Sequence, residues 1–561
     1  MIELAFPPAF ILILGAVLIG LARPGLRPAI VLLAPVVTLW AIWRLPDGVL
    51  LTTQFLGYDI ELVEASALRR LFATIFTIMA FAGGLYGLKQ SKWYELAAGY
   101  AYAAGAVGVS FAGDLITLFL FWEFMAIFST VVVWCGGTEA ARRAGVRYAI
   151  MHLIGGVVLK IGIEGIMVHT GSIEIEALNL ASWDAWIVLA GVLINAAAPP
   201  VSAWLADAYP EGSPFGTVFL SAFTTKTAVL ALILLFPGAK VLIWIGLFMV
   251  FYGIVYALLE NDMRRILAYS IVNQVGFMVT GIGIGTEMAL NGAAAHAFAH
   301  IIYKALLLMS AGAVLFQTGR RKCSELGGLY QSMPVTAVCG IIGALAISAF
   351  PYTSGFISKS MISQAAADEH LALVWYLLTA ASAGVFLHAG IKFPWFVFFQ
   401  KDSGLRPPDP PWNMQAAMIL FAVACIGLGC FPQLLYGLLP FAVDYEPYTL
   451  AHVVSQSQLL LFSGLAFFLL LPMLKRTPTI TLDVDWLWRV AAPRLWALLV
   501  RAWAAAMGAL SSVLQQAIEQ LAHARFAEAG HRKVLARAWP TGSMALWVLV
   551  VLLGFLTLHW F

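Results

Sequence analysis

Apolar stretches of about twenty residues recur along almost the whole chain, and they limit its fold more than any other feature. A stretch of this length forms a helix about 30 Å long, which matches the hydrocarbon core of a bilayer. The strands of a membrane barrel would instead alternate over about ten residues. The sequence therefore predicts about sixteen spans, at residues 5–22, 28–43, 71–88, 95–113, 115–134, 147–169, 185–206, 214–236, 240–259, 266–286, 289–316, 335–366, 372–400, 413–440, 455–474 and 541–560.

The composition agrees with a chain that lies mostly within a lipid bilayer. Of its 561 residues, 61% are hydrophobic and 11% are charged, whereas soluble domains carry about 25% charged residues. The first apolar stretch has no basic segment before it and no small-residue cleavage site, so we interpret it as a retained helix. The predicted fold class is an all-α polytopic membrane protein.

Lysine and arginine residues in the connections predict the orientation, because cytoplasmic loops are enriched in both. The basic residues after odd-numbered stretches are Arg23, Arg27, Lys89, Lys92, Arg142, Arg143, Arg147, Arg264, Arg265, Arg320, Arg321, Lys322, Lys401 and Arg406. The loops after even-numbered stretches are mostly acidic, although the loop at 44–70 is mixed. This alternation predicts an amino terminus on the extracytoplasmic side.

The stretch from Asn291 to Leu315 carries ionisable side chains although it is long enough to cross a bilayer. His296, His300 and Lys304 follow one another at four-residue steps, so a helix places them along one face. A charged group at bilayer depth costs about 2.5–3.5 kcal/mol, so this face predicts a polar interior path rather than a lipid contact. The structural alternative is hydrogen bonding between helices by the histidines and a snorkelling lysine.

Further ionisable residues lie deep in other apolar stretches. The most central of these are Glu123, Lys226 and Lys359. We interpret these three as candidate proton carriers, because an ionisable residue within a membrane usually marks an ion or proton path. Lys160 and Glu164 are four residues apart, which also permits a local ion pair without a transport role. Lys392 lies near the cytoplasmic end of its stretch, where snorkelling is the alternative.

Two stretches contain residues that break helices. Ala-Pro-Pro at 198–200 interrupts the seventh stretch, and Pro351 with Gly355 interrupts the twelfth. A His-x7-Lys spacing in the sixth stretch recurs in the eleventh. Both pairs of features lie five stretches apart, so the two units point in opposite directions, as in an inverted repeat. Isolated proline kinks are the alternative interpretation.

The segment after Leu474 changes to an amphipathic, tryptophan-rich pattern with scattered arginines. This pattern predicts a cytoplasmic helix that lies at the membrane interface or along a neighbouring subunit. We predict six regions: N-terminal helices at 1–94, a first repeat at 95–237, an inverted second repeat at 238–400, additional spans at 401–474, the amphipathic segment at 475–540 and a final span at 541–561.

Motifs for bond-making chemistry are missing from the sequence. It contains no nucleotide-binding loop, Rossmann fingerprint, haem motif or nucleophile arrangement. The five cysteines have neither a metal-ligand spacing nor a disulfide pattern. The sequence therefore predicts an ion-transporter subunit rather than an enzyme, with no cofactor, no metal and no nucleic-acid partner.

Five segments carry a resemblance to a known family. They are FWEF around Glu123, WLADAYPEGSPFGTVFLSAFTTKTAV at 204–229, ENDMRRILAYSIVNQVGFM at 260–278, HAFAHIIYKALL at 296–307 and GFISKSMI at 355–362. The chain resembles the antiporter-type membrane subunits shared by respiratory NADH dehydrogenase and multisubunit sodium/proton antiporters, most closely the D subunit of Mrp-type antiporters. The resemblance implies two inverted five-helix repeats, each with a broken helix, and a hydrated charged axis across the membrane centre.

The resemblance also implies roles for individual residues. Glu123 matches the essential glutamate of the family, Lys226 its bridging lysine, Lys304 the lysine of the second repeat and Lys359 the terminal lysine after the second break. One position departs from the pattern.

That position is Asn195, where the family usually has a lysine. We hypothesise that Lys160 replaces this lysine and reaches Glu123 from the sixth stretch. The alternative is that the first half has lost full pumping competence and serves another role.

These features predict the proton-translocating subunit of a multisubunit Na+/proton antiporter in a bacterial inner membrane. Its expected partners are other membrane subunits of that complex, together with protons and Na+. Two alternatives stay open. One is a proton-pumping subunit of a respiratory NADH dehydrogenase or a hydrogenase, and the other is a membrane scaffold or energy-coupling partner of another transporter.

Overall fold

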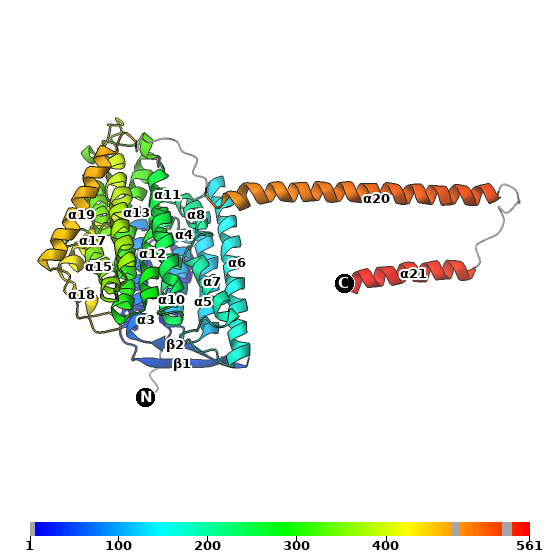
Figure 1. Cartoon of the computed structure of the whole chain (residues 1–561), viewed down its shortest axis with the longest axis horizontal. Helices are drawn as coiled ribbons and strands as arrows, with labels where there is room; N and C mark the ends of the chain where they lie inside the picture. The colour runs from blue at the N-terminus through cyan, green and yellow to red at the C-terminus, as the bar shows by residue number, and fades with distance from the viewer. Residues whose placement is uncertain (1–5, 56, 474–482, 530–540, 561) are drawn as a thin grey trace. The chain divides into compact units, whose positions relative to one another are not determined.

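The protein is seen in a computed structural model that describes residues 6–55, 57–473, 483–529 and 541–560. It is predominantly helical and forms two compact units, Met1–Val484 and Asp485–Phe561. In the first unit the long helices run roughly side by side, with a β-hairpin at one end (Figure 1).

The first unit begins with helices α1 (Pro8–Leu21) and α2 (Arg27–Ile42), followed by strands β1 (Gly48–Phe55) and β2 (Tyr58–Ala65). The strands pair antiparallel, from Gly48 opposite Ala65 to Phe55 opposite Tyr58. The prediction of an all-α fold is therefore wrong in this region. The mixed charges of the loop at 44–70 hid two strands whose inward residues, Ile60, Val63 and Ala65, are buried.

A cluster of carboxylates lies where the hairpin meets the helices. Asp114 caps the helix Leu115–Trp134, because its carboxylate accepts from the backbone N–H groups of the first turn. The same carboxylate accepts from the N–H of Glu61 at 2.7 Å. Burial raises the pKa of Glu61 above its ordinary value of 4.5, and repulsion from Glu64, Asp114 and Glu174 raises it further. Arg69 offsets part of this charge by pairing with Glu64.

Four long helices follow the hairpin: α3 (Ala67–Gly87), α4 (Trp93–Phe111), α5 (Leu115–Trp134) and α6 (Glu139–Thr170). The next spans are built from shorter pieces: α7 (Trp183–Asn195), α8 (Ala203–Ala208), α9 (Gly216–Leu220) and α10 (Thr224–Leu235). The predicted interruption at 198–200 is confirmed, because α7 ends at Asn195 and helix resumes at Ala203. A second interruption, at 221–223 between α9 and α10, was not predicted.

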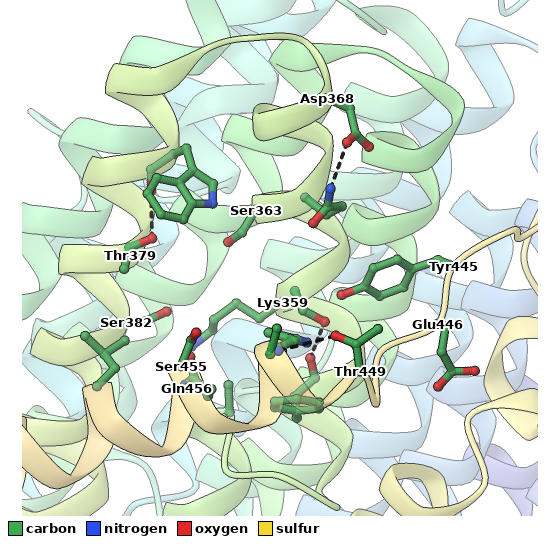
Figure 2. A pocket seen from close by; sticks show the side chains of 18 of the residues that line it. Lys359, Ser363, Asp368, Thr379, Ser382, Tyr445, Glu446, Thr449, Ser455 and Gln456 are labelled. Atoms are coloured by element: carbon green, nitrogen blue, oxygen red, sulfur yellow. Dashed lines mark hydrogen bonds between the residues drawn. The ribbon is translucent and has the colours of Figure 1, made fainter.

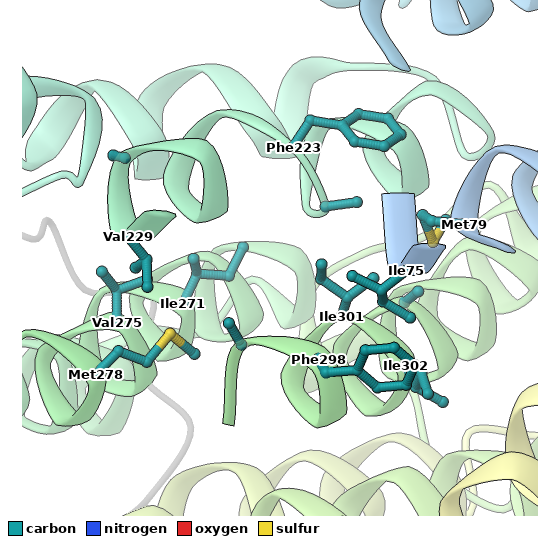
Figure 3. Packing of buried hydrophobic residues seen from close by; sticks show 14 of the residues in the cluster. Ile75, Met79, Phe223, Val229, Ile271, Val275, Met278, Phe298, Ile301 and Ile302 are labelled. Atoms are coloured by element: carbon teal, nitrogen blue, oxygen red, sulfur yellow. The ribbon is translucent and has the colours of Figure 1, made fainter. Parts of the chain in front are cut away.

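The centre of the first unit contains α11 (Val241–Leu259), α12 (Met263–Ile284) and α13 (Glu287–Thr318). Helix α13 packs against α3, α12, α14 (Pro334–Ile347), α15 (Ser354–Asp368) and α17 (Trp412–Cys430). Ile301 and Ile302 of α13 lie near Ile75 of α3, and Ile271 lies on the neighbouring α12 (Figure 3). This apolar packing surrounds α13 and leaves one of its faces for polar contacts.

The interruption predicted near Pro351 is also confirmed, because α14 ends at Ile347 and α15 begins at Ser354. Helix α16 (Ala372–Val385) continues into two π-helical segments, Phe386–Lys392 and Trp395–Phe399. Helices α18 (Gln433–Tyr436) and α19 (Leu450–Leu469) complete the unit. Short 3₁₀ turns lie at Tyr209–Glu211, Cys323–Glu325 and Leu329–Gln331.

Every predicted span coincides with helix in the described residues, but the helices differ in length. Eleven described helices are long and apolar enough to cross a membrane, and five shorter apolar helices accompany them. One of the eleven is Leu487–Leu521, within the segment that the sequence predicts to be amphipathic. The number of sixteen crossings, the inverted repeats and the six-region division stay predictions.

The second unit contains a π-helical turn (Leu487–Ala491), the long helix α20 (Ala492–Ala529) and α21 (Thr541–Trp560). Residues 475–482 and 530–540 of the predicted amphipathic segment lie outside the described residues.

At the end of the first unit, the carboxylate of Asp483 accepts hydrogen bonds from the hydroxyls of Tyr252 and Tyr269, the latter at 2.6 Å. Asp483 is thereby fixed to α11 and α12.

Candidate functional site

Helix α13 carries three of the predicted residues into the centre of the first unit. His296, His300 and Lys304 have no exposed surface. The hydrogen-bond partners of His296 and Lys304 come from α12 and α15, so the polar face of α13 points at these two helices. The predicted polar stripe therefore lies inside the protein and not toward lipid.

The ammonium of Lys304 donates to the hydroxyl of Ser270 at 2.9 Å and to the carbonyl of Leu267 at 3.2 Å. Both acceptors are neutral groups of α12. Among the described residues no carboxylate lies within ion-pair distance of Lys304. Lys304 is therefore not held in its charged state by an ion pair.

His296 connects α12 with α15. Its Nε2 lies 3.1 Å from Oε1 of Gln274, and its Nδ1 lies 3.0 Å from the hydroxyl of Ser358. Because the amide oxygen of Gln274 can only accept, Nε2 carries a proton in this arrangement, and Nδ1 faces the Ser358 hydroxyl, which also lies 3.1 Å from the carbonyl of Ser354. Tyr303 also donates to Oε1 of Gln274, at 3.1 Å, and thereby helps to fix the glutamine.

His300 has a different environment from His296. Neither of its ring nitrogens forms a hydrogen bond with any residue that the structure describes, although both are buried. Its ring lies 5.3 Å from the ring of Tyr303 and 6.4 Å from that of His296, measured between centroids. Buried polar groups without partners are rare, and they are often found at functional sites.

Two lysines are held by carbonyls that the helix interruptions release. Lys226 donates to the carbonyl of Ser221 at 2.6 Å and to the hydroxyl of Thr225 at 3.0 Å, at the start of α10. Lys359 donates to the carbonyl of Ile347 at 3.0 Å, which is the last residue of α14. The last carbonyls of a helix receive no hydrogen bond from within that helix, so they are free to bind an ammonium group.

An open cleft of about 920 Å³ leads to Lys359. It lies between α15, α16, α19 and the segment 444–449. Figure 2 shows Lys359 within this cleft, with Ser363, Thr379, Ser382 and Gln456 around it. The carboxylates in its lining are Asp368, Asp444 and Glu446. Sequence reasoning missed the cleft, although the polar run SQSQ at 455–458 within a predicted span was a signal for it.

The position that lacks the expected lysine is filled by a hydrogen-bonded pair. Oδ1 of Asn195, the last residue of α7, lies 2.9 Å from Nδ1 of His152 on α6. Glu123 on α5 is half-buried, and its Oε1 forms no hydrogen bond with any described residue. This oxygen lies directly over Gly156, where a Cβ atom would be only 2.1 Å away. Gly156 thus creates the space that Glu123 occupies.

The hypothesis that Lys160 pairs with Glu123 is not supported by the geometry. The ammonium of Lys160 lies 2.5 Å from Oε1 of Glu164 and faces the ring of Phe119. No ion pair between Lys160 and Glu123 is present. The local alternative prevails because residues four apart on one helix are neighbours, whereas the carboxylate of Glu123 is turned toward Gly156.

Lys392 is buried because backbone carbonyls bind its ammonium group. Its ammonium donates to the carbonyls of Ala257, Leu258 and Glu260, at 3.0, 2.6 and 2.5 Å. These carbonyls lie at the end of α11, where a cation complements the helix dipole. Lys392 therefore caps α11 rather than snorkelling to the membrane surface.

In the part of the chain that the structure describes, no group of three or more His, Cys, Asp and Glu side chains is arranged to hold a metal ion. The residues that converge are instead lysines and histidines with hydroxyl, amide and carbonyl partners. Such a set can accept, hold and release protons.

Comparison with known proteins places this arrangement in a family. Residues 112–386 match the profile described as NADH:quinone oxidoreductase/Mrp antiporter, TM. An uncharacterised protein of Methanocaldococcus jannaschii is 30% identical over 355 residues, which cover 59% of this chain and 73% of that protein. The D subunit of a Na(+)/H(+) antiporter from Alkalihalophilus pseudofirmus is 29% identical over 61% of this chain and 71% of its own length.

The A/B subunit of a probable K(+)/H(+) antiporter from Rhizobium meliloti is 29% identical over 64% of this chain, but this chain spans only 40% of that protein. Among solved structures, a chain of the Mrp complex from Dietzia sp. DQ12-45-1b superposes with a TM-score of 0.69, at 22% identity over 81% of this chain and 99% of that one. A chain of the archaeal membrane-bound sulfane sulfur reductase superposes with a TM-score of 0.73, at 21% identity over 98% and 99%. The chain belongs to the NADH:quinone oxidoreductase/Mrp antiporter family of membrane subunits.

Proposed function

We propose that this chain relays protons across a bacterial inner membrane as a subunit of a multisubunit cation/proton antiporter. The observation that carries the proposal is the burial of three lysines, Lys226, Lys304 and Lys359, without a carboxylate counter-ion among the described residues. An ion pair would fix a lysine in its charged form. Neutral acceptors instead allow the amine to exchange protons, which is what a relay requires.

The hydrogen bonds support a path through the second half of the site. His300 lies one turn and His296 two turns before Lys304 on α13. His296 contacts Ser358, and Ser358 is the residue before Lys359. A proton that reaches Lys304 therefore has imidazole and hydroxyl groups at intermediate positions toward Lys359.

The cleft supports an exchange of protons between Lys359 and solvent. Its lining carries three carboxylates, Asp368, Asp444 and Glu446, which attract cations electrostatically. In our predicted orientation these carboxylates lie on the extracytoplasmic side. Lys359 is only 2% exposed, so the cleft approaches it without opening the rest of the path.

The names of the relatives support a cation/proton exchange within a complex. The D subunit of a Na(+)/H(+) antiporter and the A/B subunit of a probable K(+)/H(+) antiporter are both similar to this chain. We propose Na+ as the exchanged cation and other membrane subunits as partners. We further propose Glu123 as an acceptor in the first half, where Asn195 and His152 replace the usual lysine.

A second candidate is a proton-pumping subunit of a respiratory complex. It is favoured by relatives named as the M and N subunits of NADH-quinone oxidoreductase. Such a complex contains iron–sulfur subunits, which absorb visible light. Purification of the intact complex in mild detergent separates the two candidates, since an antiporter complex would be colourless.

Proton flux in everted membrane vesicles tests the main proposal. We expect Lys304→Ala or Glu123→Gln to reduce Na+-driven proton release to background in the assembled complex. The matched control is Lys240→Met, which removes a lysine whose one hydrogen bond to a described residue goes to the carbonyl of Ile284. Full activity of either path variant would refute the assignment, and a loss in the control would show that the assay reports folding instead.

A further inference from the structure

Between Val146 and Val168 the outward face of α6 is apolar except at one place. Its exposed large hydrophobic residues are Val146, Ile150, Leu153, Ile154, Val157, Ile161 and Val168. Glu164 lies in the same row, with 53% of its side chain exposed, and its partner Lys160 is 37% exposed. A charged pair thus stands on a surface that otherwise has the composition of a lipid contact.

The pair lies well inside the bilayer. The end of α6 at Thr170 is level with the start of α5, because the N–H of Leu115 binds the carbonyl of Ile173. At 1.5 Å per residue, Glu164 lies about 9 Å and Lys160 about 15 Å inward from Thr170. With the start of α5 at the edge of the hydrocarbon core, whose half-thickness is about 15 Å, Glu164 lies within the core and Lys160 lies near its centre.

The pair is also incompletely bonded. Glu164 uses one oxygen to bind Lys160, and no other hydrogen bond of Glu164 to a described residue is present. Hydrocarbon cannot donate to the remaining oxygen, and leaving such a group unsatisfied is unfavourable in lipid. A carboxylate in this position needs an N–H or O–H donor from another polypeptide.

The net charge of the surface limits what can dock on it. Glu123 is half-buried beside Gly156, on the same pair of helices α5 and α6. With both carboxylates ionised and Lys160 protonated, the three side chains carry one net negative charge. A second copy of this chain packed symmetrically on this face would repeat that charge. Helix α21 contains no lysine or arginine between Thr541 and Trp560.

We propose that the α5–α6 face is the docking surface for a membrane-spanning helix of a different subunit, which places a hydrogen-bond donor or a cationic side chain against Glu164. This rests on the proposed function only in requiring a multisubunit complex. It does not depend on which ion is exchanged. The Lys160–Glu164 pair then acts as a polar contact that selects the partner, because an apolar helix cannot complete it.

Cross-linking in the native complex tests the position of the partner. A photoreactive residue in place of Ile161 should capture a transmembrane peptide of another subunit that contains a donor side chain at the level of Glu164. The same residue in place of Phe248, exposed on α11, serves as the control and should capture lipid. Capture of lipid, of this chain's own α20 or α21, or of a second copy from position 161 would overturn the proposal.

A paired substitution tests the chemistry. We expect Lys160→Leu with Glu164→Leu to reduce the amount of the adjoining subunit that co-purifies by about tenfold or more. Val157→Leu on the same row is the matched control and should leave it unchanged. The double variant should still elute as a monodisperse chain, because leucine suits a lipid-facing position. An unchanged subunit composition in the double variant would refute the docking surface, whatever its ion flux. Absence of ion flux in the unmodified complex, with the adjoining subunit lost in the double variant, would count only against the proposed function.

Discussion

Replacing Gly156 by alanine should displace the carboxylate of Glu123. A Cβ at this position would lie 2.1 Å from Oε1, and real Cβ contacts are essentially never shorter than 3.0 Å. The carboxylate must therefore retreat by about 1 Å. Because it is the flexible end of a side chain and has no hydrogen bond to a described residue, we expect the movement to cost little stability.

Function should be affected far more than stability. A displacement of about 1 Å can slow a reaction roughly 100-fold when groups must be aligned for transfer. We therefore expect Gly156→Ala to reduce proton flux in everted vesicles by up to about two orders of magnitude. Alanine also increases helix propensity by up to about 1 kcal/mol. A control at an adjacent glycine separates this gain from the steric effect.

Gly155→Ala provides that control, since its Cβ would lie 3.1 Å from a methyl group of Ile194 and at an ordinary contact distance of 3.6 Å from Oδ1 of Asn195. It should change the free energy of unfolding in denaturing detergent as Gly156→Ala does, within about 1 kcal/mol, but leave the flux near that of the unmodified protein. In a Glu123→Ala background, Gly156→Ala should have no further effect. Wild-type flux in Gly156→Ala, or equal losses at both glycines, would refute this role of Gly156.

Three further predictions concern residues with defined partners. Ser270→Ala removes the 2.9 Å hydrogen bond to Lys304, so flux should fall about tenfold while Ser310→Ala does not change it. Lys392→Met should lower the free energy of unfolding by about 1.5–3 kcal/mol, because three carbonyls lose a charged donor. Reduced flux with unchanged stability would contradict the role of Lys392 as a cap of α11. Glu61→Gln should raise the melting temperature at pH 7–8, because a raised folded-state pKa destabilises the fold once the carboxyl ionises. The gain should vanish well below the ordinary pKa of 4.5, and a pH-independent gain would contradict this.

Much of the helical architecture was predictable because each span must satisfy its own backbone hydrogen bonds within lipid. The interruptions at 198–200 and near Pro351 were predictable because proline removes a donor. The interruption at 221–223 was not, since Ser-Ala-Phe carries no helix-breaking residue and tertiary packing decides its conformation. The β-hairpin was missed because its charged residues resemble those of an ordinary loop.

The candidate site was predictable in its members but not in its pairings. A four-residue step places His296, His300 and Lys304 on one face whatever the tertiary structure. The partner of a side chain, however, depends on which neighbouring helix it meets. Lys160 therefore pairs with Glu164 on its own helix, and no ion pair joins it to Glu123.

The carbonyls that bind Lys226 and Lys359 have a consequence for how this chain can change during evolution. A backbone carbonyl is present whatever residue occupies the position, so substitution of Ser221 or Ile347 does not delete the acceptor. Only loss of the lysine or closure of the helix interruption abolishes the contact. Sequence drift around these two lysines is therefore tolerated, and harmful variants should concentrate at the lysines themselves and at residues that hold the interruptions open.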